Sequence, residues 1–112
     1  MSYGLVKVGG QEVAMEANAL SPYVYRQLFH EDFLAETQKA EPAPDLFQKM
    51  GYVMAMQAAH LGTAELMKLT IDGFYEWLTQ FDALDLILAT DKISELYLSQ
   101  NAELSVPKSK AE

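Results

Sequence analysis

The chain has 112 residues, of which 50% are hydrophobic, and its 16 acidic and 8 basic side chains give a formal net charge of −8. A negative chain is a poor partner for a nucleic-acid backbone, which needs clustered Lys and Arg, and the hydrophobic content excludes compositional disorder. Because the sequence contains no cysteine, it excludes a disulfide framework, a thiolate metal site and a thiol nucleophile.

The apolar segments are too short and too interrupted for a signal peptide or a membrane span, which needs about 18 unbroken apolar residues. We therefore expect an intracellular protein with no membrane partner. The length predicts one domain with a modest core, which we place over residues 1–101. The polar segment 102–112 is expected to be a disordered tail.

Residues 3–16 predict a β-hairpin. Apolar and polar residues alternate on both sides of Gly9-Gly10, and this pair supplies the positive φ that a tight turn requires. A phosphate-binding loop is the competing interpretation of the two glycines. It is disfavoured because no Lys-Ser/Thr pair and no G-x-G-x-x-G pattern follows them.

A helix is expected over residues 22–40, with Ser21 as its N-cap and Pro22 in its first turn. The sequence also allows a break near His30, after which Asp32 would cap a second short helix. Pro42 and Pro44 then indicate a stiff linker before the next helix. The residues expected to face inward are Val24, Tyr25, Leu28, Phe29, Phe33 and Leu34.

The central helix is expected over residues 46–61, capped by Asp45 and ended by Gly62. It is apolar on nearly all sides, which predicts neighbours on more than one face. One row of side chains at helical spacing is assigned to the core: Phe47, Met50, Met54, Ala58 and Leu61. A second row is where we expect self-association or client contact: Tyr52, Met56 and Ala59.

Two further helices are expected over residues 71–81 and 83–100, with Thr70 and Asp82 as their caps. The first carries an apolar face of Phe74, Trp77, Leu78 and Phe81. The second is expected to bury Leu84, Ile87, Leu88, Ile93, Leu96 and Tyr97. The fold class is therefore mainly α (α+β), an N-terminal β-hairpin followed by four to five helices packed as a small orthogonal bundle.

No pattern in the chain indicates catalysis. His30-Glu31-Asp32 invites a metal or acid/base interpretation, but the zincin spacing needs a second His where the chain has Leu34. His60 is the other histidine, on a different helix, and acids near Asp82 are explained by a helix N-terminus. We predict a protein that is not an enzyme, with no catalytic, cofactor or metal residues. A metal-dependent regulator built on His30, His60 and Asp82 stays open as an alternative.

Methionines concentrate in and near the central helix, at Met50, Met54, Met56 and Met67. Methionine is an adaptable filler of cores, and it is also common on surfaces that bind varied partners. Core packing is the default interpretation for each of them. A Met-bearing second row nevertheless favours the contact surface assigned to Tyr52, Met56 and Ala59.

Several segments together resemble the tail assembly chaperones of long-tailed phages and prophages of Gram-positive bacteria. The resemblance runs in order from about Val6 to Lys110, and His30 stands where the pattern has a glycine. The matching positions are Ser21-Pro22, Tyr25-Arg26 and Phe29; Tyr52, Met54-Ala55 and Gln57-Ala58; Trp77-Leu78 and Phe81-Asp82; and Asn101.

The resemblance implies a non-enzymatic role. Such proteins bind the tape measure protein and the major tail protein, which is the tail tube subunit, in the host bacterial cytoplasm, and they are absent from the mature virion. It also fits a homo-oligomer, since the hairpin's free edge could pair with a neighbouring copy. The alternative function is a small structural virion or tail-completion protein.

Overall fold

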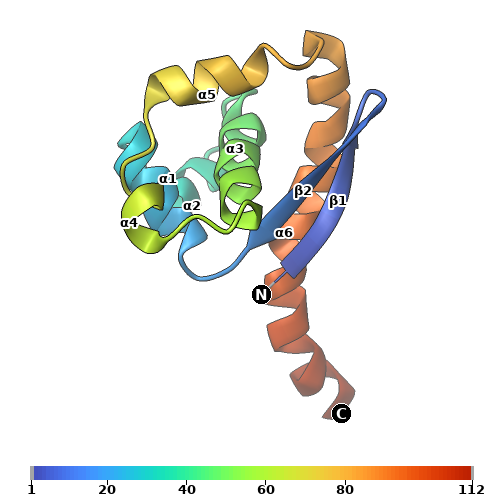
Figure 1. The fold of residues 1–112 in the computed structure, drawn as a ribbon. Helices are drawn as coiled ribbons and strands as arrows, with labels where there is room; N and C mark the ends of the chain where they lie inside the picture. The colour runs from blue at the N-terminus through green and yellow to red at the C-terminus, as the bar shows by residue number, and fades with distance from the viewer. Residues whose placement is uncertain (1, 112) are drawn as a thin grey trace.

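The computed structural model describes the backbone of residues 2–111 and the side chains of residues 2–99. An antiparallel hairpin precedes six helices, which confirms the predicted mainly α (α+β) class. Figure 1 shows the hairpin lying along α6 and beside α3, while α5 crosses one end of the molecule. The elements are β1 (Ser2–Val8), β2 (Gln11–Ala17), α1 (Ser21–Phe29), α2 (Phe33–Thr37), α3 (Leu46–Ala58), α4 (Thr63–Leu66), α5 (Ile71–Leu78) and α6 (Ala83–Ala111).

The hairpin turns through Gly9 and Gly10, with Val8 paired to Gln11 and Ser2 to Ala17. Gly9 has a φ of 62°, the positive value that a two-residue turn of type II′ needs at its first position. Because side chains alternate along each strand, one face of the hairpin is buried against the helices. Val6, Val8, Met15 and Ala17 are buried, whereas Tyr3, Leu5 and Lys7 are exposed.

The helix expected over residues 22–40 is broken into α1 and α2. His30 adopts the left-handed conformation (φ 59°, ψ 37°) and its N–H donates to Arg26 O at 2.8 Å, which ends α1. Asp32 Oδ1 then accepts from the N–H of Leu34 at 3.1 Å and caps α2. Leu34 was expected to face inward, but it is exposed, because the short α2 buries only Phe33.

Two expected N-caps are not formed by side chains. Leu20 occupies the N-cap position of α1, and the buried Ser21 hydroxyl instead accepts from Asn18 N–H and donates to Gln57 Oε1. The side chain of Asp45 makes no capping hydrogen bond to α3. Thr70 does cap α5, since its hydroxyl accepts from Gly73 N–H at 3.1 Å.

The central helix ends earlier in the structure than the sequence predicts. α3 ends at Ala58 rather than at residue 61, and the left-handed residue that follows it is His60 (φ 64°). Gly62 does not terminate α3; it begins α4, where Glu65 Oε1 accepts from its N–H at 3.0 Å. The glycine signal therefore marked the start of the next helix and not the end of this one.

α3 lies at the centre of the core, and Met50, Val53 and Met54 are fully buried. α6 approaches it closely at Gly51. A Cβ atom placed on Gly51 would lie 2.9 Å from Ile93 Cδ1, so the absent side chain permits this contact. The hairpin packs on both helices, which places α3 between the hairpin, α1, α5 and α6.

α6 buries Ile93 and Tyr97 as expected, and Leu96 is half-buried, but the beginning of the helix buries a different face from the one expected. The buried side chains are Leu86, Ala89, Ile93 and Tyr97, spaced by three and four residues, so they form one helix face. Leu84, Ile87 and Leu88 were expected inside, but they lie on the opposite face and are exposed. The helical backbone runs beyond the expected end near residue 100 to Ala111. Side chains from residue 100 onward lie outside the described part, so the disordered tail over 102–112 stays a prediction.

Candidate interaction surfaces

The three residues predicted for partner contact do not form one exposed row. The Tyr52 side chain is only 4% exposed, because its ring packs against Phe74 and Trp77 of α5 at centroid distances of 5.6 and 5.5 Å. Burial also raises the pKa of its phenol. Met56 is half-buried and Ala59 is exposed. Tyr52 therefore attaches α5 to α3 and is covered within the chain, whereas partner contact through Met56 and Ala59 stays a prediction.

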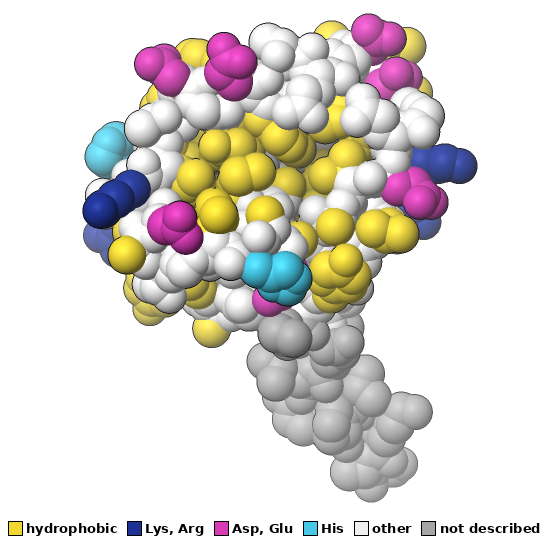
Figure 2. Space-filling view, in the orientation of Figure 1, with side chains coloured by type: hydrophobic (Ala, Val, Ile, Leu, Met, Phe, Trp, Pro, Cys, Tyr) yellow, Lys and Arg dark blue, Asp and Glu magenta, His cyan; other side chains and the backbone are white. Residues whose placement is uncertain are grey.

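An apolar hollow lies on the face framed by α3, α5 and the hairpin. Figure 2 shows hydrophobic side chains gathered across this hollow, with polar and charged side chains around its rim. A continuous apolar surface of this kind is typical of a contact site.

A second apolar surface lies on the outward side of α6. Leu84, Ile87 and Leu88 are 64%, 53% and 68% exposed, and we call these three residues the α6 row. Their spacing places them on one helix face. Ile87 also borders a small hollow of about 180 Å³ that is lined by Leu78, Phe81 and Leu86. The α6 row is therefore a ridge with a groove beside it.

Sequence reasoning missed the α6 row, although a signal for it was present. Residues 86–89 are hydrophobic without interruption, so this run by itself allows either face of the helix to point inward. Steps of four and three residues back from Ile93 reach Ala89 and Leu86. The face that carries Leu84, Ile87 and Leu88 has larger side chains than the face that carries Ala89. Size alone therefore favoured the wrong face as the inward one.

Charge is distributed unevenly around α5 and the beginning of α6. From Leu69 to Asp91 the chain contains no Lys or Arg, and its acids there are Asp72, Glu76, Asp82, Asp85 and Asp91. Figure 2 shows acidic side chains along α5 and near the start of α6, with Lys and Arg at the two sides of the molecule. The α6 row therefore lies in a negatively charged part of the surface.

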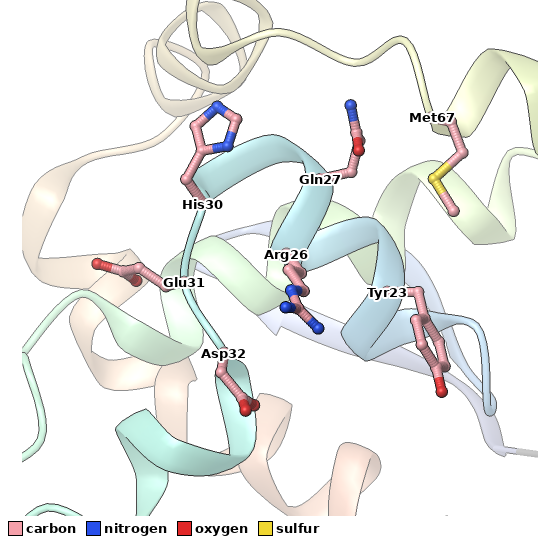
Figure 3. Close-up of a pocket in the computed structure, with 7 residues that line it drawn as sticks. All are labelled: Tyr23, Arg26, Gln27, His30, Glu31, Asp32 and Met67. Carbon is pink, nitrogen blue, oxygen red and sulfur yellow. The ribbon is translucent and has the colours of Figure 1, made fainter.

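An open cavity of about 570 Å³ lies beside the end of α1. Figure 3 shows that its side chains do not converge: His30 and Gln27 point to one side, Asp32 points to the other, and Glu31 points away. Asp32 is engaged as the cap of α2, and Glu31 contacts Lys49 and Tyr25. The geometry therefore assembles no acid/base pair in this cavity.

Glu31 is held by two donors at the joint between α1 and α2. Lys49 Nζ lies 3.0 Å and Tyr25 Oη 2.9 Å from its Oε1. The hydrogen bond from Lys49 lowers the pKa of Glu31, while burial and the neighbouring carboxylate raise the pKa of Tyr25. Lys49 also lies over the Phe29 ring, 5.2 Å from its centroid. These contacts fasten the joint to α3.

Metal ligands do not cluster in the described part of the chain. Among its His, Asp and Glu side chains, no group of three is arranged to hold a metal ion. His30 and His60 both follow helix ends as exposed residues in the left-handed conformation, so their placement has a local backbone reason. Within the same residues, no helix combines the length and apolar character that crossing a membrane requires.

Comparison with known proteins adds no relative: no family model, no curated protein and no solved structure matches this chain.

Proposed function

We propose that this chain is a phage tail assembly chaperone, a non-enzymatic protein that covers apolar surfaces of the tape measure protein and the major tail protein. It would act in the host bacterial cytoplasm and be absent from the mature virion. The resemblance described above suggests the partners. The observation that carries the proposal is the amount of exposed apolar surface on an acidic, mainly helical domain.

Single exposed hydrophobic residues are ordinary, but grouped ones indicate a contact site. Among the described residues, such groups include the hollow framed by α3, α5 and the hairpin, and the α6 row. A net charge of −8 makes copies of the chain repel one another, which opposes aggregation through these surfaces. An apolar surface in an acidic chain suits temporary contact with an aggregation-prone client.

The unpaired strand edges of the hairpin support a further part of the proposal, association between copies. The sheet has two strands, so β1 and β2 each present one edge without a strand partner. Such edges are templates for pairing with another chain. We infer that a homo-oligomer forms through one of them, and sedimentation at increasing concentration tests this.

Co-expression with the tape measure protein encoded in the same locus tests the function. We expect more of the tape measure protein to stay in solution, and the two proteins to purify together. No gain in solubility and no complex would reject the proposal. Mass spectrometry of purified particles then separates the chaperone from a structural virion or tail-completion protein, because a chaperone is missing from the particle.

A further inference from the structure

We propose that the α6 row binds an amphipathic helix with basic flanks, contributed by another protein. The inference rests on the proposed function and specifies one contact surface and the chemistry of its partner. It concerns Leu84, Ile87 and Leu88, which the fold leaves more than half exposed although each is a large aliphatic residue.

The shape of this surface favours a helix as the occupant. Residues at i, i+3 and i+4 form a ridge, and helices pack by placing such ridges into grooves. The hollow beside Ile87, lined also by Leu78 and Phe81, offers a groove for a side chain of the partner. In helix-in-groove complexes, an amphipathic helix places its apolar side chains into a hydrophobic groove.

The charge around the row favours a basic partner and disfavours a second copy of this chain. Asp91 lies on the same helix face as Leu84 and Leu88, one turn further along, and Asp82 borders the hollow beside Ile87. The first base beyond them is Lys92, whose Nζ already lies 3.5 Å from Glu95 Oε1. Two copies joined at this face would bring like charges together. An anionic membrane surface would be repelled for the same reason.

Peptide binding tests the proposal. The probe is a labelled amphipathic peptide of Leu and Lys, about 18 residues or five helical turns long, and the matched probe replaces each Lys with Glu. We expect the Leu/Lys peptide to bind the full chain in fluorescence anisotropy and the Leu/Glu peptide to bind at least about tenfold more weakly.

Variants on two faces locate the site. Leu84→Ser/Ile87→Ser/Leu88→Ser should weaken binding of the Leu/Lys peptide by about tenfold or more, since exposed anchors are lost. Tyr23→Ser/Leu34→Ser removes exposed apolar residues from α1 and α2 and should bind like the wild type. Asp91→Lys keeps the row and should narrow the difference in affinity between the two peptides, since one acid beside the row is replaced by a base.

Three results obtained with the purified chain would overturn the proposal. They are unchanged binding by the triple variant, equal binding of both peptides, and a wild-type dimer that the triple variant converts to monomer. If circular dichroism shows the triple variant unfolded, Asp91→Lys decides the question. A triple variant that still keeps the tape measure protein in solution rejects this surface while leaving the proposed function intact.

Discussion

α3 and α6 are both rich in hydrophobic residues, yet α3 is buried nearly all round and α6 leaves a row of aliphatic side chains exposed. The difference lies in their neighbours. α3 is surrounded by the hairpin, α1, α5 and α6, whereas α6 is packed against the hairpin and α3 on one side. Hydrophobic content alone therefore does not decide burial; the number of elements that cover a helix does. Because the fold covers α3 on nearly all sides, the exposed α6 row stands out as a surface available to a partner.

The largest expected effect is in the middle of α3. Met54→Ala removes a fully buried side chain, and we expect the free energy of unfolding to fall by about 2–5 kcal/mol. The matched Leu88→Ala change on α6 should alter it by no more than about 0.5 kcal/mol, because that side chain is already exposed. Urea unfolding measures both. Similar losses in the two variants would mean that α6 is covered in solution.

The next effect concerns the polar contact that α3 makes with α1. Gln57 Oε1 accepts from the buried Ser21 hydroxyl at 2.6 Å, and its Nε2 donates to Asn18 Oδ1 at 3.0 Å. Gln57→Leu leaves the buried Ser21 hydroxyl without its acceptor, while Asn18 Oδ1 still accepts from Leu20 N–H, and should cost about 1–3 kcal/mol. Adding Ser21→Ala should then cost less than it does in the wild type, since the two residues act together. Strict additivity in urea unfolding would contradict this coupling.

A smaller, pH-dependent effect is expected at Lys49. Its contact lowers the pKa of Glu31 below the ordinary 4.5, so the unfolded chain binds the proton more readily than the folded one. The Lys49–Glu31 pair therefore stabilises the folded state above pH 4.5, and this stabilisation is lost as the pH falls through the lowered pKa of Glu31. Lys49→Met should cost about 1 kcal/mol at neutral pH, a modest value because Glu31 is partly exposed.

Melting temperatures at neutral and acidic pH check this expectation for Lys49. The difference in melting temperature between the wild type and Lys49→Met should narrow as the pH drops below 4.5 and through the lowered pKa of Glu31. Lys39→Met is the control, because the Lys39–Glu36 pair has an exposed lysine and should contribute little. A gap that stays constant with pH would mean that Lys49 stabilises α3 only through its contacts with aromatic rings.

The smallest expected effect on stability is at His30, in the segment between α1 and α2 that places Glu31 beside α3. His30 adopts a left-handed conformation that glycine adopts without strain. We expect His30→Gly to raise the free energy of unfolding by about 0.5–1 kcal/mol. Gln27→Gly, inside α1, should lower it by about 1 kcal/mol. Equal losses in chemical denaturation would show that the His30 side chain itself stabilises the joint.

Much of the fold could be predicted because the local signals were strong. Gly9-Gly10 between alternating strands indicated the hairpin, and Thr70 and Asp32 behaved as the caps that their side chains suit. The predictions were wrong where a residue typical of a helix end plays a different role in the fold. Ser21 was expected to cap a helix, but its hydroxyl bonds Gln57 across the core, and Gly62 was expected to end α3, but it starts α4.

The candidate site was less predictable than the fold. Tyr52, Met56 and Ala59 were grouped by helical spacing, and spacing does not show that α5 returns to cover Tyr52. The α6 row was assigned to the core, since large aliphatic residues usually lie inside. Both errors have one cause, because burial depends on contacts between segments distant in the sequence.

The sequence by itself determined the hairpin, the helical class and the acidic charge, because turn geometry, helical periodicity and composition are local or additive properties. Only the tertiary structure decided which faces have neighbours. Gly51 leaves room for the Ile93 side chain to pack against α3. Once Ile93 faces inward, the 3.6-residue period of the helix turns Leu84, Ile87 and Leu88 outward. The surface proposed to bind a partner is thus a consequence of how the core packs.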